Sequence, residues 1–227
     1  MRKHELGFSI QKIDRRNIQR TSERIQSRKN YFIGKLNTMR KEHIVCVDET
    51  HLAFSTTQRK YGCFNRQERP VLENEVVRQK KFALFCAITA ADIPHYEIHD
   101  ITQQSTTSSH IISFLHNLNN KLPSHYSILL DNAPIHRSEE RSSIIESMPR
   151  QFIFLPPYHP ELNPIEFVFS EFKRALYGTD IINLPQNLRS LISRYNATQY
   201  HKLCNYYHHS FVTNTKQSSE GRTQINQ

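Results

Sequence analysis

The sequence predicts an α/β fold in which a mixed β-sheet is flanked by helices and preceded by a basic helix. Three observations lead to this prediction. Short apolar runs of strand type begin at His43, helical and strand patterns alternate from about Ser105, and a clear amphipathic helix covers 165–176. Strands followed by alternating helices and strands favour a sheet with helices on its faces. At 227 residues the chain can bury one good core and a small appendage.

Positive charge is concentrated at the start of the chain. Residues 1–42 contain 12 Lys or Arg and 4 Asp or Glu, which is +8 of the formal net charge of +9. From Asp14, a possible N-cap, to about Met39, apolar residues recur every seven positions and predict a helix. Four arginines recur every four positions along it: Arg16, Arg20, Arg24 and Arg28. They could bind nucleic-acid phosphates, but a solvated helix face has the same pattern.

The elements expected after this helix follow from local patterns. The predicted strands are 43–48, 60–64, 81–90, 96–99, 126–130 and 151–155. The predicted helices are 105–122, 136–148, 165–176 and 185–199. No apolar run is long enough to cross a bilayer, and no signal-peptide core is present, so a soluble, intracellular protein is expected. The four cysteines lack paired spacing, so free thiols are favoured.

The helix at 165–176 has the clearest boundaries. Asn163 is a good N-cap, Pro164 suits the first helical position and Gly178 suits the C-terminal cap. One face is apolar and is expected to be buried: Ile165, Val168, Phe169, Phe172 and Leu176. A second face holds Glu166, Ser170, Lys173 and Tyr177. This arrangement leaves Glu166 beside the core and able to point toward the edge of the sheet.

Three carboxylates stand at the ends of predicted elements. Asp48 follows an apolar run, Asp131 closes another, and Glu166 opens the amphipathic helix, with 34 residues between Asp131 and Glu166. Each has an ordinary alternative: a turn residue for Asp48, an Asx turn for Asp131, and a capping box with Asn163 for Glu166. Together they suggest convergence on one point. Clustered carboxylates suit one or two Mg²⁺ ions, and two ions about 4 Å apart can promote displacement at phosphorus.

Three blocks of sequence carry a resemblance to a known family. They are Val47-Asp48-Glu49-Thr50, then Leu130-Asp131-Asn132-Ala133-Pro134-Ile135-His136, then Leu155-Pro156-Pro157-Tyr158-His159-Pro160-Glu161-Leu162-Asn163-Pro164-Ile165-Glu166. Over residues 43–177 the chain resembles the mariner-type DDE transposases, the DDE superfamily endonucleases with an RNase H-like catalytic fold. The third block is long and specific, and the 34-residue gap matches the branch whose third acid is Glu.

The resemblance implies a function and roles for particular residues. Asp48, Asp131 and Glu166 would be the catalytic triad and the ligands of Mg²⁺ or Mn²⁺, with two ions expected. Asn132 and His136 would support those ligands, although a histidine at a helix start is often only structural. Lys173, a possible solvated helix lysine, matches a basic position of the family and would contact DNA. The implied reaction is hydrolysis at transposon ends followed by attack of the 3′-hydroxyl on target DNA.

The resemblance also implies partners, a location and a domain order. Double-stranded DNA and a second copy of the chain are expected partners, and no membrane is involved. The protein would act in a eukaryotic nucleus or in the bacterial cytoplasm or nucleoid. The domains would be a basic linker helix (1–42), the catalytic domain (43–180), a helical extension (181–212) and a disordered tail (213–227). The alternative is a truncated or co-opted derivative that binds DNA or protein without cutting.

Departures from the family pattern are few. His159 replaces a common serine and Phe169 replaces a usual tryptophan. Family members carry two helix-turn-helix modules before the first Asp, whereas 47 residues precede Asp48 here, so most of that region is expected to be missing. A group of possible zinc ligands lies near the end: His201, Cys204, His208 and His209. It lacks a second cysteine pair, so a structural role is favoured.

Overall fold

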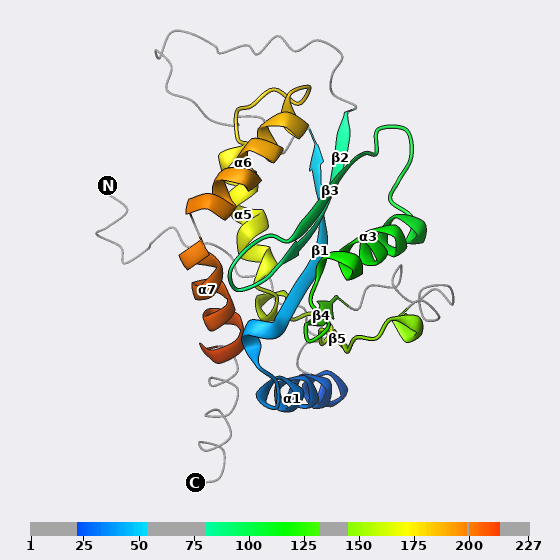
Figure 1. Cartoon of the computed structure of the whole chain (residues 1–227), viewed down its shortest axis with the longest axis vertical. Helices are drawn as coiled ribbons and strands as arrows, with labels where there is room; N and C mark the ends of the chain where they lie inside the picture. Colours follow the sequence, from blue (N-terminus) through cyan, green and yellow to red (C-terminus); the bar gives the residue numbers. More distant parts are fainter. Residues whose placement is uncertain (1–21, 54–79, 132–144, 199, 214–227) are drawn as a thin grey trace, which may run out of the picture.

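The computed structural model describes residues 22–53, 80–131, 145–198 and 200–213 and centres on a five-stranded sheet (Figure 1). The strands are β1 (Ile44–Ala53), β2 (Lys81–Ile88), β3 (His95–Asp100), β4 (Ser127–Leu130) and β5 (Phe152–Phe154). Their order is β3-β2-β1-β4-β5. The pairs β1–β2 and β2–β3 are antiparallel, whereas β1–β4 and β4–β5 are parallel. The predicted mixed sheet is therefore confirmed.

Helices cover both faces of this sheet. The α-helices are α1 (Glu23–Asn37), α3 (Ser108–Lys121), α5 (Ile165–Ala175), α6 (Leu184–Thr198) and α7 (Tyr200–His208). Short 3₁₀ helices cover Lys41–His43 and Pro160–Leu162, and π-helical residues His209–Thr213 follow α7. In Figure 1, α3 lies on one side of the sheet and α5, α6 and α7 lie on the other. In the part of the chain that is described, no helix is long and apolar enough to span a membrane.

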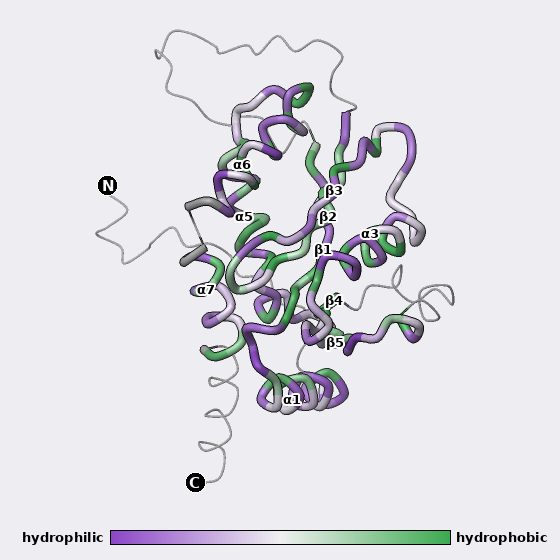
Figure 2. The backbone as a smooth tube through the Cα atoms, viewed as in Figure 1, coloured by the Kyte–Doolittle hydropathy of each residue, from purple (hydrophilic) through white to green (hydrophobic). Residues whose placement is uncertain are grey.

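The sheet separates two hydrophobic layers. On β1, Val45 and Val47 pack in the layer that contains α3 residues such as Phe114. Cys46 and Leu52 point the other way, into the layer that contains the buried residues of α5, α6 and α7. Figure 2 shows the corresponding pattern, with hydrophobic stretches on the central strands and alternating hydrophobic and hydrophilic residues along the helices. The alternation of side chains along β1 therefore decides which helices each residue faces.

β1 is longer than the predicted strand 43–48, and Asp48 therefore has a different position in it. β1 was expected to end at Asp48, but it continues to Ala53. The continuation is stabilised by β2, which pairs with β1 from Cys46–Ile88 through Ala53–Lys81. β2 is almost wholly buried, and its pairing keeps the polar residues of β1 in a strand although their sequence lacks a strand-like pattern. Asp48 is thus in the middle of a strand and not at its end.

The described part of α1 begins later than the predicted helix. Ser22 is extended and the helix starts at Glu23, while the expected N-cap Asp14 lies outside the described residues, as do Arg16 and Arg20. Ile25 and Phe32 are buried, as the seven-residue repeat predicted, and Arg24 and Arg28 are exposed. Also outside the described part are the predicted strand 60–64, most of the predicted helix 136–148, and residues 214–227 of the predicted tail.

Two polar side chains tie peripheral elements to the sheet. The buried Tyr207 hydroxyl of α7 lies 2.9 Å from the carbonyl oxygen of Ile44 and 2.6 Å from that of Ile88, at the start of β1 and the end of β2. Arg150, just before β5, donates to the backbone carbonyls of Asn119, Leu122 and Pro123 at the C-terminal end of α3. It thus satisfies carbonyls that a helix end leaves without partners.

Candidate active site

Asp48 and Asp131 each follow the last residue pair of the parallel ladder between β1 and β4. The parallel ladder between β1 and β4 ends with the pair Val47–Leu130, and the two aspartates are the next residues on each chain segment. Asp48 shares its face of the sheet with Cys46, which packs in the layer on the α5 side. Leu129 is in the same layer, and the same alternation places Asp131 on that face. The strand pairing therefore brings together two acids 83 positions apart in the sequence.

Asp48 is half-buried and both of its carboxylate oxygens accept hydrogen bonds. Oδ1 accepts from the backbone N–H of Glu49 at 2.8 Å, and Oδ2 accepts from the side-chain amide of Asn163 at 3.2 Å. Asn163 is 1% exposed, and its Oδ1 accepts from the backbone N–H of Ile165 at 3.4 Å. Asn163 therefore connects the first aspartate directly to the beginning of α5.

Glu166 lies in the first turn of α5 and is exposed. A capping box would require its carboxylate to accept the backbone N–H of Asn163. That N–H instead donates to the carbonyl of Pro160 at 2.8 Å, within the 3₁₀ turn that precedes the helix. The predicted buried face of α5 is confirmed, since Ile165, Val168, Phe169, Phe172 and Leu176 are all buried. Glu166 is on the other face, as is Lys173, which is half-buried.

The three acids are electrostatically coupled. Burial, and after it the charges of Asp131 and Glu166, raise the pKa of Asp48 to about 8, although the hydrogen bond from the Glu49 N–H opposes the change. The pKa of Glu166 is also raised, first by loss of solvent and then by Asp131, whereas Lys173 lowers it. Repulsion of this kind means that full ionisation of the three groups is unfavourable without a nearby positive charge.

The loop from Leu155 to Pro164 positions Glu166 and contains a backbone outlier. Tyr158 has a φ of 62°, a left-handed conformation that side chains other than glycine rarely adopt, and its ring is exposed. The residues after it are firmly held. His159 is buried and its Nδ1 lies 2.9 Å from Glu161 Oε1, while Leu162 is completely buried. The loop is therefore anchored on both sides of the turn that leads into α5.

The residues fit a divalent cation in chemistry. Carboxylate oxygens are the ligands that Mg²⁺ and Mn²⁺ prefer, and a cation would relieve the repulsion that raises the pKa of Asp48. Within the described ranges, however, no three His, Cys, Asp or Glu side chains form a ready-made metal-binding group. That finding includes the described members of the possible zinc group near the C-terminus, where Cys204 is exposed. Asn132 and His136 lie outside the described residues.

Asn163 is the site residue whose role sequence reasoning missed. The sequence favoured Asn163 as the helix N-cap, but Pro164 occupies that position with helical backbone angles, and Asn163 is extended. The Asn163 side chain is thus available to bind Asp48. The signal was the Asn163-Pro164 pair itself, because the residue before a proline is biased away from helical angles.

Comparison with known proteins gives the same picture of the fold. Residues 43–186 match the family described as DDE superfamily endonuclease. The chain is similar to a solved structure of the Mos1 transposase paired-end complex with left transposon end, at 18% identity and a TM-score of 0.75, covering 99% of this chain and 69% of that chain. No curated protein matched the sequence.

Two further structures extend this comparison. The mariner Mos1 paired-end complex with Mg is 19% identical with a TM-score of 0.72, covering 99% of this chain and 69% of that one. The catalytic domain of Mos1 mariner transposase is 16% identical with a TM-score of 0.69, covering 95% of this chain and 100% of that one. At these identities the likeness concerns the fold, and it confirms the expected RNase H-like arrangement of sheet and helices.

Proposed function

Because this chain belongs to the DDE superfamily endonucleases, we propose that it cuts DNA by metal-dependent hydrolysis and joins the freed 3′-hydroxyl to target DNA. The similar solved structures include a Mos1 transposase paired-end complex with a left transposon end and a Mos1 paired-end complex with Mg. In this proposal Asp48, Asp131 and Glu166 are the catalytic residues. The observation that carries it is the pairing of β1 with β4, which brings Asp48 and Asp131 to neighbouring positions on the α5 face.

The three acids would hold Mg²⁺ or Mn²⁺, with two ions expected. Bound metal would supply a positive charge to the phosphate and lower the pKa of the attacking hydroxyl. Asn163 would fix the orientation of the Asp48 carboxylate, because its amide donates to Oδ2 while the Glu49 N–H donates to Oδ1. The anchored loop before α5 would keep Glu166 near the two aspartates. Asn132 and His136 remain proposed supports of the ligands.

DNA would approach along surfaces that carry positive charge. Lys173 lies on the same face of α5 as Glu166 and lowers the pKa of that carboxyl, so its ammonium would be available to a phosphate of bound DNA. Arg24 and Arg28 are exposed on α1 and suit a more distant part of the duplex, together with Arg16 and Arg20. These contacts carry no sequence information, so they would position DNA without selecting it.

The assembly and domain order are also proposed. Two of the similar structures are paired-end complexes, and by analogy two copies of this chain would act together on two DNA ends. Residues 1–42 would form the linker, 43–180 the catalytic domain and 181–212 the helical extension. Within the described part, α6 and α7 pack in the same hydrophobic layer as α5, which supports a helical extension that completes the catalytic domain.

The test is nicking of supercoiled plasmid by the purified protein with Mn²⁺. Asp131→Asn should reduce the nicking rate at least about 100-fold, because metal stabilisation of the transition state is worth several kcal/mol and 1.36 kcal/mol is tenfold in rate. Asp100→Asn is a matched control, since Asp100 is an exposed aspartate at the end of β3. Mn²⁺ binding measured by calorimetry should weaken in Asp131→Asn alone. Undiminished nicking by Asp131→Asn would refute the assignment and favour a non-catalytic binding protein.

A further inference from the structure

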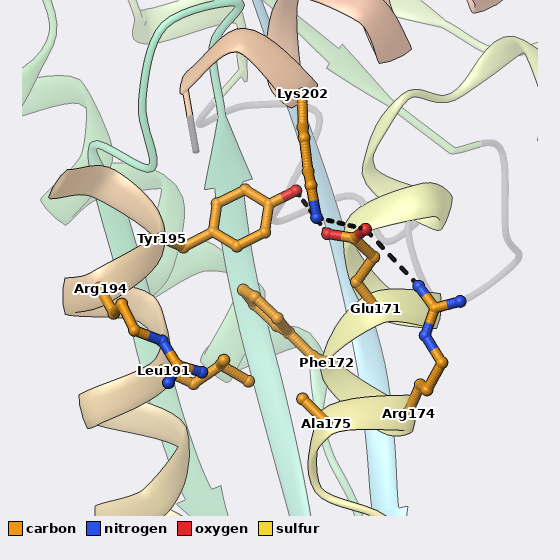
Figure 3. A pocket seen from close by; sticks show the side chains of 8 residues that line it. All are labelled: Glu171, Phe172, Arg174, Ala175, Leu191, Arg194, Tyr195 and Lys202. Carbon is orange, nitrogen blue, oxygen red and sulfur yellow. Dashed lines mark hydrogen bonds and ion pairs between the residues drawn. The ribbon is translucent and has the colours of Figure 1, made fainter. Parts of the chain in front are cut away.

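A small pocket lies between α5, α6 and α7, away from the three acids. Its volume is about 190 Å³, and Figure 3 shows its lining side chains converging from the three helices. The apolar part of the lining consists of Phe172, Ala175 and Leu191. The polar part consists of Glu171, Tyr195 and three cationic side chains, Arg174, Arg194 and Lys202. The pocket therefore combines an apolar surface with an excess of positive charge.

Glu171 is the single acid of the pocket and is already engaged. Its Oε1 lies 3.0 Å from Lys202 Nζ, and its Oε2 accepts the Tyr195 hydroxyl at 2.9 Å. Although burial opposes it, hydrogen bonds from Lys202, Tyr206 and Tyr195 hold the pKa of Glu171 below its usual value. Glu171 is thus ionised and balances one of the three cations. The lining of the pocket keeps a net charge of +2.

The two arginines are placed at the rim. Arg174 approaches Glu171 at 3.5 Å, but its side chain is 77% exposed, so this ion pair contributes little and leaves the guanidinium in contact with solvent. Arg194 is exposed on α6. In Figure 3 the two guanidinium groups lie on opposite sides of the pocket, with Lys202 entering from α7. An anion deep in the pocket would meet the carboxylate of Glu171, whereas one that crosses the rim would meet the arginines.

We propose that this rim, formed by Arg174 and Arg194, binds the phosphodiester backbone of DNA. Guanidinium groups match phosphate oxygens with paired N–H donors, and a backbone that crosses the rim presents successive phosphates to both. Arg174 is eight residues beyond Glu166 on α5, or about 12 Å along the helix axis. That distance corresponds to about three to four base pairs of duplex. The site would therefore hold DNA beside the segment that is cut.

The identity of the ligand rests on the proposed function, but the test does not require cleavage. Binding of a short duplex is measured in EDTA from low to moderate salt. Each lost phosphate contact makes the slope of log K against log[salt] shallower by about 0.9. The loss of affinity between 50 and 200 mM salt then becomes about threefold smaller. Arg174→Gln and Arg194→Gln should each produce this reduction. Arg194→Lys, which keeps the charge, should retain the wild-type slope.

Arg189→Gln is the matched control. Arg189 is exposed on α6, five residues before Arg194, and does not line this pocket. It should leave the slope unchanged, and thermal melting should show that all variants are folded. If Arg174→Gln and Arg194→Gln change the slope no more than Arg189→Gln does, the proposal is wrong. A second outcome also contradicts the proposal. If orthophosphate raises the Tm of the wild type more than that of Arg194→Gln, but both proteins have the same salt slope for DNA binding, the rim binds free phosphate only.

This outcome is independent of the nicking experiment. Failure of the catalytic proposal would show as full activity in Asp131→Asn, with DNA binding in EDTA unaffected. Failure of the rim proposal would show as equal salt slopes, with nicking by the wild type unaffected. The two results can therefore be told apart in one set of purified variants.

Discussion

Replacement of Arg150 should destabilise the fold more than any exposed arginine does. Its guanidinium donates to the carbonyl oxygens of Asn119 at 3.0 Å and Pro123 at 2.7 Å, and also to those of Leu122 and Tyr126. A fifth contact reaches the side chain of Asn119. A hydrogen bond to a charged group contributes about 1.5–3 kcal/mol, but Arg150 is only partly buried and water can replace some contacts. We therefore expect Arg150→Ala to cost about 3 kcal/mol.

Thermal unfolding followed by circular dichroism measures this loss. For a domain of this size, 1 kcal/mol corresponds to about 2–4 °C, so Arg150→Ala should lower Tm by about 6–12 °C. Arg189→Ala, on the exposed face of α6, should stay within about 0.5 kcal/mol of the wild type. Arg150→Lys should recover only part of the lost Tm, because a single ammonium group cannot donate to all of the carbonyl oxygens that the guanidinium contacts. Equal Tm values for Arg150→Ala and Arg189→Ala would refute the reasoning.

Two further predictions concern the centre of the sheet. Burial and neighbouring carboxylates raise the pKa of Asp48 from 3.8 to about 8, so the folded protein binds a proton that the unfolded chain has released between these values. The stability of the metal-free protein should therefore fall as pH rises from about 4 to about 8, and Asp48→Asn should weaken this dependence of Tm on pH in EDTA; an unchanged dependence would contradict the shift. Tyr207→Phe removes the hydroxyl that lies 2.9 Å from the carbonyl oxygen of Ile44 and 2.6 Å from that of Ile88. It should lower the free energy of unfolding, measured by chemical denaturation, by about 1–3 kcal/mol. The exposed Tyr177→Phe is its control, and equal midpoints would show that the buried hydroxyl contributes nothing.

Sequence patterns predicted the sheet and the buried face of α5 because both depend on regular spacing of apolar residues. Val45 and Val47 alternate with Ile44 and Cys46, and every expected core residue of α5 is buried. The pattern did not predict the length of β1, since residues 48–53 are mostly polar. That extension depends on pairing with β2, which is about 30 to 40 residues away in the sequence and invisible to local periodicity.

The sequence proposed the three acids of the candidate site, whose catalytic role stays a prediction, but not the surroundings of those acids. Spacing and the resemblance indicated Asp48, Asp131 and Glu166, but no local pattern states that Asn163 reaches across to Asp48. The left-handed backbone at Tyr158 was equally hidden, because tyrosine carries no preference for that conformation. Both features arise from the way the loop is held between β5 and α5, which only the folded chain defines.

The pairing of β1 with β4 also bears on when the chain can become active. Asp48 leaves the ribosome long before Asp131, and Glu166 follows later still. Parallel strands form only after a long loop has closed, so their pairing is slow compared with the formation of a helix or a hairpin. An incomplete chain has β1 and β2 but no second aspartate beside the first. The proposed DNA-cutting activity would therefore arise late in synthesis, after β4 has paired with β1 and α5 has packed on the sheet.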